Sequence, residues 1–331
     1  MSKLLKINIF YDSNYWLKDR KIFDKNIFNS SLFNFYYKKK LKSLKPISNK
    51  FIKSGPQKLI NNLIKYFKDS EDIVFNKNKF SNYYFPTVDL NSLENIKNIL
   101  KDKDKKIIAG PLYTNSTFKN LIKLCEDFTN LKIVTASESS KNMAMKIAGE
   151  SVSSDTFVVL PIAVISSNEK LTTQRKEDKC LIYFKGGDKK ELDQVKQILK
   201  NLNIQFKLFE YGNYSNLNLI RKAKNYKFGV VLGRTESQGI AINEIMGCGL
   251  PLLIFNSTIN EYEGMTFEGT SVPFWNNECG EIVDRSQSME ETIENFISNV
   301  KSGLYNPQNY VRKNLSVEAM RINFLNIFES F

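Results

Sequence analysis

The chain has 331 residues, 42% of them hydrophobic, and carries a formal net charge of +13 at pH 7. This length allows two domains with separate cores, and no stretch approaches the ~20 uninterrupted apolar residues of a membrane-spanning helix. The sequence contains no histidine, which excludes a Ser-His-Asp triad, a histidine general base and histidine-ligated zinc. Any catalysis therefore uses carboxylates, lysine or arginine, hydroxyls and backbone dipoles.

The positive net charge favours anionic partners such as nucleotide diphosphates, acidic lipid surfaces or nucleic acid. Alternatively, the positive charge reflects only the general composition of the chain, which is rich throughout in lysine, asparagine, isoleucine, phenylalanine and tyrosine. Many of the lysines can then lie on solvated faces. No known nucleic-acid-binding module is recognisable, so no nucleic-acid partner is predicted.

Cysteine usage and the N-terminus bear on the cellular compartment. The cysteines lack C-x-x-C spacing and are predicted to be reduced core residues of a cytosolic protein. They are Cys125, Cys180, Cys248 and Cys279. The N-terminal residues lack both a signal-peptide core and a small-residue cleavage site. The chain is therefore expected to stay in the cytoplasm, where it is made.

Strand and helix patterns alternate in the first half of the chain. A first strand is predicted at 4–11, and a helix at 56–66 starts with a proline and keeps its apolar residues on one face. Further strands or apolar runs are predicted at 72–75, 106–112, 131–136 and 155–165, and further helices at 92–100, 116–128 and 139–148. This alternation indicates βαβ units and a parallel sheet.

About forty residues separate the first strand from the first helix, far more than the ~2–6 of an ordinary βα loop. The stretch 13–53 is therefore predicted to be an insertion in a functionally placed loop. Within it, residues 32–45 read LFNFYYKKKLKSLK. Aromatic residues beside lysines could seat the chain peripherally on an anionic membrane, where each basic residue contributes ~1 kcal/mol, or bind an acidic glycan acceptor. The alternative is a helix with a solvated lysine face.

The polar, aperiodic stretch 166–179 predicts a domain boundary, after which the α/β pattern restarts. Strands are predicted at 180–184, 205–211, 228–232 and 251–255, and helices at 190–202, 215–226 and 288–300. Residues 256–281 are expected to form the last strands and a loop, without assigned chemistry. The final segment, 307–331, has the apolar spacing of a helix.

The stretch 228–255, FGVVLGRTESQGIAINEIMGCGLPLLIF, is predicted to be a strand, a loop, a helix and a second strand. Glu236 lies in the loop at the carboxyl end of the first strand, and Glu244 lies in the second turn of the helix. The helix ends at 247–249, and Pro251 cannot continue it. Ligands bind at this edge of open α/β sheets, because strand ends and helix N-termini face one crevice. The alternative is an ordinary polar loop that contains an acid.

The spacing of Glu236 and Glu244, with Gly239 opening the helix and Gly249-Leu250-Pro251 closing it, resembles the Glu-x7-Glu signature of retaining glycosyltransferases with the GT-B fold. These enzymes form the group that is similar to glycosyltransferase family four, also called glycosyl transferases group 1. The group includes sucrose and glycogen synthase-like enzymes. The resemblance implies two Rossmann-like domains whose parallel sheets face each other across a cleft. It implies an acceptor-side domain at 1–165, a nucleotide-sugar donor domain at 166–305 and a C-terminal helix at 306–331 that crosses back to the first domain.

The same resemblance implies a hexosyltransferase-like enzyme that moves a sugar from a nucleotide-diphosphate sugar to a hydroxyl acceptor. The acceptor would be a glycan, a lipid-linked glycan or another hydroxyl compound. No cofactor and no metal are expected, because this fold normally works without a metal.

The resemblance also implies roles for individual residues. Lys185 matches the basic residue that grips the donor diphosphate, and Lys189 or Lys190 could match a second one. As a bare pattern, lysine before two glycines is a surface turn by default, although such a loop can place a cation and N–H groups beside phosphate. By resemblance, Glu236 hydrogen-bonds the hydroxyls of the transferred sugar, and Glu244 accepts from the ribose hydroxyls.

Further residues are assigned to the donor by their place in the pattern. N–H groups at the helix start are expected to hold the diphosphate. They belong to Ser237, Gln238, Gly239 and Ile240. Arg234 would add charge near the phosphates, with a structural ion pair as the alternative. By resemblance, Tyr211-Gly212 falls where the nucleotide base is held, and Gly55 remains from the glycine-rich loop after the first strand.

Two other classes of function stay open. A nucleotide-sugar binding protein, or an inactive GT-B relative, is suggested by the reduced glycine loop and by the missing histidine, which the family often places near the donor sugar. A nucleotide-sugar epimerase is less favoured, because it would need acid/base residues in the N-terminal crevice, where Glu138 hardly suffices. Glu138 could instead contact the acceptor or stabilise a helix N-terminus.

Overall fold

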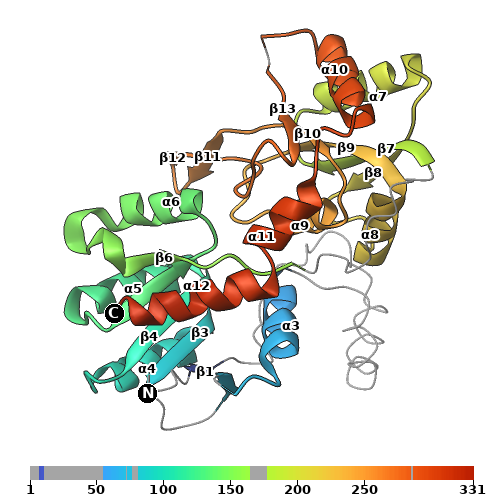
Figure 1. The fold of residues 1–331 in the computed structure, drawn as a ribbon. Helices are drawn as coiled ribbons and strands as arrows, with labels where there is room; N and C mark the ends of the chain where they lie inside the picture. The colour runs from blue at the N-terminus through green and yellow to red at the C-terminus, as the bar shows by residue number, and fades with distance from the viewer. Residues whose placement is uncertain (1–6, 11–54, 72, 77–80, 165–176, 285) are drawn as a thin grey trace, which may run out of the picture. The chain divides into compact units, whose positions relative to one another are not determined.

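The computed structural model describes residues 7–10, 55–71, 73–76, 81–164, 177–284 and 286–331 (Figure 1). The whole of the predicted insertion at 13–53 lies outside the described residues, and so does most of the boundary predicted at 166–179. Contacts divide the chain into two compact units. The first comprises residues 1–134, 150–156 and 330–331, and the second comprises 135–149 and 157–329.

Two parallel sheets form the framework of the chain, which confirms the predicted α/β class. The larger sheet has the strand order β2-β1-β3-β4-β5-β6, and the smaller one has the order β13-β10-β9-β7-β8. The larger sheet contains β1 (Ile7–Ile9), β2 (Ile73–Phe75), β3 (Asn82–Val88), β4 (Lys106–Tyr113), β5 (Leu131–Thr135) and β6 (Phe157–Val159). The smaller sheet contains β7 (Glu177–Lys185), β8 (Gln205–Glu210), β9 (Tyr226–Gly233), β10 (Leu252–Phe255) and β13 (Gly280–Ile282).

In the first unit, helices α3 (Gly55–Phe67), α4 (Leu90–Leu100) and α5 (Asn115–Asp127) accompany strands whose side chains are largely buried. Ile7 and Ile9 are fully buried, as is Leu59 of α3. The amphipathic pattern of 56–66 therefore marks the buried face of a helix, as predicted, since apolar residues at helical spacing share one side.

Strand β3 was missed by the sequence analysis, although it lies between β1 and β4 and all its residues are buried. It contains Pro86, which cannot donate to a ladder and argues against an interior strand. The structure accommodates the proline by a register shift against β4 between Phe85 and Thr87. A bulge of this kind is not apparent from residue types alone.

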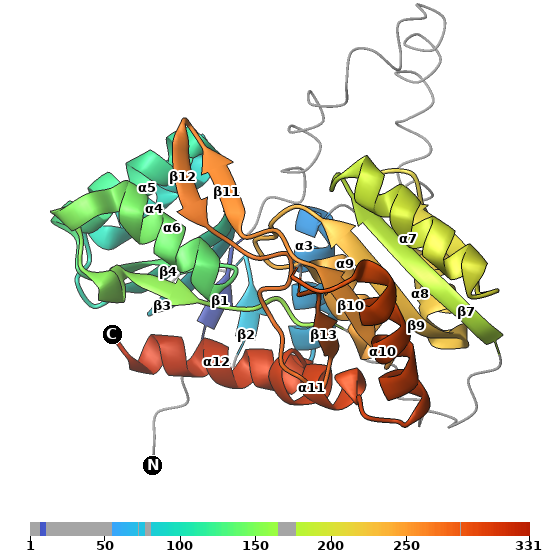
Figure 2. The same ribbon diagram turned by 90° about the horizontal axis from the view of Figure 1, so that it is seen from above.

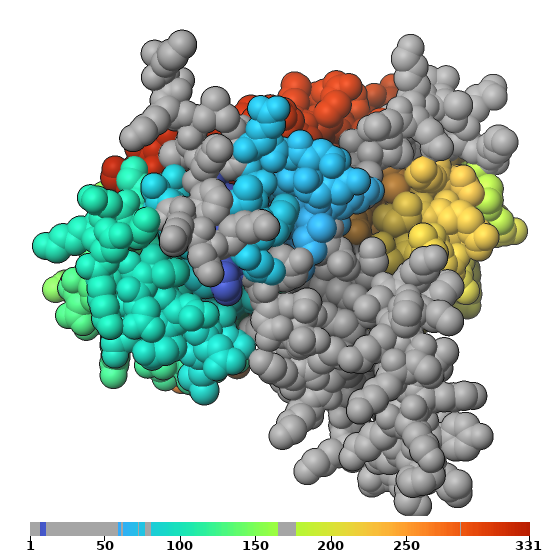
Figure 3. Space-filling view, turned by 90° about the horizontal axis from the view of Figure 1, so that it is seen from below, coloured from blue at the N-terminus to red at the C-terminus, as the bar shows by residue number. Residues whose placement is uncertain are grey.

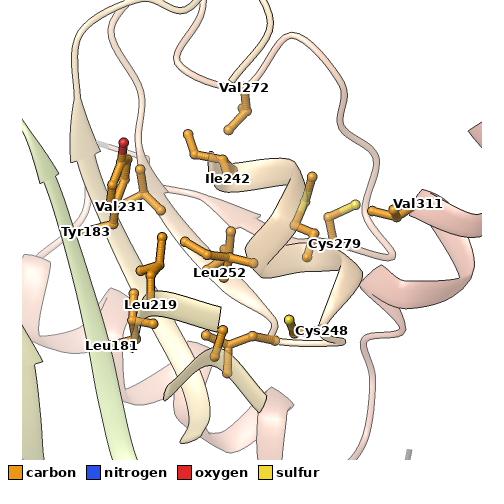
Figure 4. Close-up of a cluster of buried hydrophobic side chains, with 14 of the residues drawn as sticks. Leu181, Tyr183, Leu219, Val231, Ile242, Cys248, Leu252, Val272, Cys279 and Val311 are labelled. Carbon is orange, nitrogen blue, oxygen red and sulfur yellow. The ribbon is translucent and has the colours of Figure 1, made fainter. Parts of the chain in front are cut away.

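In the second unit, helices cover both faces of the smaller sheet. One buried cluster joins alternate strand residues, such as Leu181 and Val231, to α8 (Asn216–Asn225), α9 (Ile240–Gly247) and α11 (Pro307–Asn314) (Figure 4). The other joins Ile182 and Val230 to α7 (Lys189–Asn201) and α10 (Met289–Lys301). Successive strand residues face opposite sides, so strands this uniformly apolar fit a sheet covered on both faces.

The remaining elements of the second unit are peripheral to this sheet. They include α6 (Glu138–Ala148) and an antiparallel hairpin of β11 (Ile259–Tyr262) and β12 (Met265–Glu268), drawn in orange in Figure 2. Helix α8, yellow in Figure 3, lies at the molecular surface, where Leu217 is exposed.

The C-terminal segment forms two helices, α11 and α12 (Val317–Glu329), where the spacing had predicted one. The backbone of Leu315 leaves the helical region (φ −126°, ψ 15°), and its N–H still donates to Val311 O. Ser316 then starts the second helix, because its Oγ accepts from the N–H of Ala319 at 3.1 Å. Apolar spacing continues through such a break, which explains why periodicity missed it.

Three of the cysteines, Cys180, Cys248 and Cys279, are buried, whereas Cys125 is half-buried, and all four thiols are free. Burial raises the pKa of the Cys279 thiol to about 12. Among the helices that the structure describes, none combines the length and apolar character needed to cross a bilayer.

Candidate functional site

Strands β7, β8 and β9 end together at one edge of the smaller sheet. Lys185, the last residue of β7, lies opposite Gly233, the last residue of β9, and Phe184 lies opposite Glu210, the last residue of β8. The loops that follow these strands therefore leave the sheet side by side. In open parallel sheets, this edge is where ligands bind.

A short ion pair links the end of β7 to the loop after β9. Lys185 Nζ lies 2.6 Å from Glu236 Oε1, and only 25% of the lysine side chain and 12% of the glutamate side chain are exposed. The loop after β8 contributes Tyr211, because Lys185 Nζ also lies 4.7 Å from the centroid of its ring. A cation at this distance is attracted by the ring face. The structure thus brings together three of the predicted residues, which are far apart in the sequence.

The carboxyl group of Glu236 is held in an unusual environment. Burial raises its pKa above the ordinary value, and the neighbouring charge and hydrogen bond of Lys185 partly oppose this shift. Desolvation disfavours the charged form of an acid, whereas a nearby cation favours it. The site therefore holds an ionisable acid away from water and in contact with one cation.

The glycines after Lys185 allow close approach to the end of β9. A Cβ on Gly187 would lie 3.3 Å from Gly233 N, and Gly186 has φ +71°. Arg234 Nε donates to the carbonyl of Gly186 at 3.3 Å, and the residue remains exposed. Within the described parts of the chain, Arg234 makes no ion pair, so its charge is not used by the contacts seen here.

The start of helix α9 has no capping side chain. Its N-cap residue is Gly239, with φ +71°, and its first turn contains no acidic residue. The N–H groups of a first helical turn have no partner within the helix, and they give this end a partial positive charge. The N–H of Glu236 is already used, because it donates to Thr270 O at 2.8 Å. The helix start thus suits an anion.

Two tyrosines that the sequence analysis did not single out lie close enough to the glutamates to interact with them electrostatically. Tyr183 and Tyr214 have hydroxyl oxygens 3.5 Å apart, and burial raises the pKa of both. Tyr214 interacts electrostatically with both Glu236 and Glu244. Tyr183 precedes Lys185 by two residues and therefore shares its face of β7, which is the signal that could have identified it.

Other predicted residues lie outside this cluster of contacts. Lys190 is exposed in the first turn of α7, and its N–H donates to Asp188 Oδ1. Gly212 is exposed in the turn after β8, with φ +85°. Ser237 is exposed, and Gly55 is the first residue of α3 in the first unit. No hydrogen bond or ion pair joins these residues to Lys185 or Glu236 in the described structure.

No family model matches the chain, and no curated protein matches it. Several solved structures are similar to the chain, and glycosyltransferases are among them. The apo form of the lipopolysaccharide outer core galactosyltransferase WaaB matches with a TM-score of 0.46 and 13% identity, over 98% of this chain and 99% of that one.

Two further solved structures are similar over most of their own length. The sucrose-phosphate synthase of Thermosynechococcus elongatus has a TM-score of 0.46 and 10% identity, over 76% of this chain and 73% of that one. WaaG, a glycosyltransferase involved in lipopolysaccharide biosynthesis, has a TM-score of 0.44 and 11% identity, over 84% of this chain and 96% of that one.

Proposed function

We propose that this chain is a retaining glycosyltransferase that moves a sugar from a nucleotide-diphosphate sugar to a hydroxyl acceptor. The proposal rests chiefly on the 2.6 Å contact between Lys185 Nζ and Glu236 Oε1, which lies at the edge where open parallel sheets generally bind ligands. A diphosphate-linked sugar needs a cation for its phosphates and an acceptor for its hydroxyls. The ion pair offers both groups at one point.

In the proposed reaction, the bond between C1 of the sugar and the diphosphate oxygen breaks, and its electron pair leaves with the diphosphate. The acceptor oxygen bonds to C1 on the same face of the sugar, and the acceptor's hydroxyl proton passes to the departing diphosphate. Negative charge thus builds up on the leaving group and positive charge on the sugar ring. Fixed charges and dipoles aimed at these positions lower the barrier.

Lys185 is assigned to the leaving diphosphate, with Arg234 as a second cation. The N–H groups of residues 237–240 are assigned to the phosphate oxygens, because the start of α9 has no side-chain cap and such an end attracts anions. Lys190, near the start of α7, is the candidate for a further phosphate contact. These cations would neutralise the leaving group, so the proposal includes no metal and no cofactor.

Glu236 and Glu244 are assigned to the sugars of the donor. When the diphosphate attracts Lys185, the Glu236 carboxylate becomes available to accept from hydroxyls of the transferred sugar. Glu244 is assigned to the ribose, and Tyr211-Gly212, on the loop after β8, to the base. The partial burial of these acids supports the assignment, because hydrogen bonds to charged groups strengthen in a water-poor site.

The acceptor is proposed to be a glycan or a lipid-linked glycan, with the chain in the cytoplasm. Gly55, at the start of α3, is the candidate in the first unit for a donor contact. Peripheral contact with an anionic membrane through the basic insertion at 13–53 belongs to the same proposal, and liposome binding would test it.

The function is tested with a panel of UDP-, GDP- and ADP-sugars. One donor should raise the melting temperature by mass action, and the wild-type protein should release its nucleoside diphosphate faster when a hydroxyl acceptor is present. The anomeric configuration of the product should equal that of the donor. Binding without release would favour a nucleotide-sugar binding protein, and full transfer by a variant lacking both Glu236 and Glu244 would end the proposal.

A further inference from the structure

Gln238 is a polar residue in the loop between Glu236 and helix α9, and it is only 3% exposed. Its side-chain Nε2 donates to the carbonyl of Ile162 at 2.7 Å. The main-chain carbonyl of Gln238 accepts a hydrogen bond from Nδ2 of Asn243 at 3.1 Å, and Asn243 is only 2% exposed. Both the side chain and the main chain of Gln238 are therefore fixed by buried hydrogen bonds.

The carbonyl that receives the Gln238 amide belongs to a firmly packed segment. Ile162 is 5% exposed, and Ala163 and Val164 beside it are also buried. The N–H of Val164 donates to Leu315 O at 3.0 Å, and Val164 belongs to the buried cluster that contains residues of α8 and α9. Ile162 thus lies in a buried segment that is also held by the hydrogen bond of Val164 to Leu315.

The other polar atom of the Gln238 side chain, Oε1, is not satisfied by this arrangement. Gln238 Oε1 is buried and has no hydrogen-bond partner among the described residues. A buried acceptor without a partner opposes folding, and methionine would fill a similar volume without it. Packing alone therefore does not explain an amide here, whereas the tether to Ile162 does.

We infer that Gln238 is a positioning residue, which holds the loop 236–240 so that the Glu236 carboxylate and the first N–H groups of α9 stay aligned with Lys185. This inference rests on the proposed function. Glu236 N–H is tied to Thr270 O, and Gly239, with φ +71°, has no Cβ to restrict the backbone. Without the Gln238 tether, the segment between these two points would lose its side-chain anchor.

The test compares Gln238→Met with the matched control Gln308→Met. Gln308 Nε2 donates to Gly247 O at 3.4 Å, so the control removes an amide-to-carbonyl bond at the opposite end of α9. Gln238→Met should lower kcat about 10- to 100-fold, since a displacement of ~1 Å in a reacting group can cost ~10²-fold. Its affinity for the free nucleoside should change less than about twofold, whereas Gln308→Met should keep the wild-type kcat.

Hydrogen exchange of the amides in 236–243 provides a measurement independent of activity. Exchange there should rise at least about tenfold in Gln238→Met and stay at the wild-type level in Gln308→Met. Unchanged exchange, or an unchanged kcat in Gln238→Met, would overturn the inference. A wild-type protein that binds no nucleotide sugar would overturn the proposed function instead, and the exchange result would still decide whether Gln238 tethers the loop. If Gln238→Met does not fold, Asn243→Ala, which removes the second bond, replaces it in the same measurements.

Discussion

The helices of this chain begin in two different ways. In α4 to α8, a side chain accepts a hydrogen bond from an N–H of the first turn. These caps are Asp89, Thr114, Ser137, Asp188 and Ser215. Helix α9 starts with Gly239, without a side-chain cap and without an acidic residue in its first turn. Helix α10 also lacks a cap hydrogen bond, but it has Glu290 and Glu291 in that turn.

Helix starts that are capped by a side chain have part of their N–H groups satisfied within the protein, whereas the uncapped start of α9 leaves its N–H groups available to a ligand. Among the helices whose N-caps the structure describes, α9 combines the absence of a cap with the absence of an acid. The same end lies next to Glu236, whose partner Lys185 is a potential phosphate cation. A capped helix start contributes stability, whereas an uncapped one beside a cation favours an anion.

The largest effect is expected for Lys185→Met. Loss of a charge that stabilises the transition state typically lowers kcat by ~10²–10³, and we expect a decrease of this size in kcat with the nucleotide sugar that binds. The matched control is Lys196→Met, because Lys196 has a similarly exposed side chain (28%) and pairs with Asp193 at 3.0 Å on the surface of the same unit. Steady-state kinetics should show wild-type turnover for the control. An equal decrease of kcat in both variants would contradict a specific role of the Lys185 ion pair in turnover.

The two glutamates should differ in the kinetic parameter that they affect. Glu236→Ala should mainly lower turnover, by ~10²-fold, because its contact with the transferred sugar matters most in the transition state. Glu244→Ala should mainly weaken donor binding, by ~10-fold, which corresponds to one hydrogen bond to a charged group. Measurements of kcat and KM over a range of donor concentrations separate the two cases. A loss of kcat in both variants with unchanged KM would contradict the assignment of Glu244 to the ribose.

Gly239→Ala and Ser215→Ala compare an open helix end with a capped one. A Cβ on Gly239 meets no atom closer than 3.8 Å, so Gly239→Ala should cost ~1–2 kcal/mol through its left-handed backbone alone. It should also reduce nucleoside diphosphate affinity, because the Cβ obstructs the approach of phosphate. Ser215→Ala removes the bond that Ser215 Oγ accepts from Asn218 N–H at 3.2 Å, costs ~1 kcal/mol and should leave that affinity unchanged.

Chemical denaturation and calorimetric titration of both variants check these two effects. Gly239→Asn separates strain from obstruction, since asparagine tolerates the left-handed region better than alanine. It should be more stable than Gly239→Ala and equally impaired in diphosphate binding. Full diphosphate affinity in both glycine variants would show that the phosphates do not approach this helix end.

The smallest effect concerns stability and pH. Burial raises the pKa of Glu236 in the folded protein, so the folded state binds this proton more tightly than the unfolded state, where the pKa is ~4.3. The resulting contribution to the free energy of unfolding is fully present below the unfolded pKa and is lost as pH rises through the folded pKa. Glu236→Gln does not titrate, so its free energy of unfolding relative to wild type should rise from acidic to neutral pH. Urea denaturation at several pH values measures this change.

Glu278→Gln provides the opposite sign in the same experiment. A hydrogen bond from Asn309 lowers the pKa of Glu278 in the folded protein. The ionised Glu278 therefore stabilises the wild-type protein above the unfolded pKa, and this contribution is lost as pH falls through the folded pKa. The relative stability of Glu278→Gln should therefore decrease as pH rises. The same direction of change in both variants would contradict the assignment of burial as the main influence on Glu236.

Much of the site could be predicted because it depends on local patterns. The strand, the loop and the helix around Glu236 follow each other within 228–255, and glycines mark both ends of the helix. The contact between Lys185 and Glu236 spans 51 positions, and the resemblance implied only that both residues serve the donor. The distance between them comes from strand register, which the sequence alone does not give.

Other features depended on contacts that no local pattern encodes. The tether from Gln238 to Ile162 spans 76 positions, and nothing near Gln238 distinguishes it from a solvated loop residue. Strand β3 was missed because Pro86 contradicts an interior strand unless a register shift accommodates it. These features are set by tertiary packing, which can override local preference.

The central claim is that the edge formed by Lys185, Glu236 and the start of α9 binds the diphosphate of a nucleotide sugar. Isothermal titration of wild type and Lys185→Met tests it most directly, with UDP, GDP and ADP and with the matching nucleosides. For one base, wild type should bind the diphosphate at least ~10-fold more tightly than the nucleoside, a difference of ~1.4 kcal/mol, and Lys185→Met should lose most of that preference while its nucleoside affinity stays unchanged. Equal affinity of wild type for diphosphate and nucleoside, or an undiminished preference in Lys185→Met, would contradict the claim.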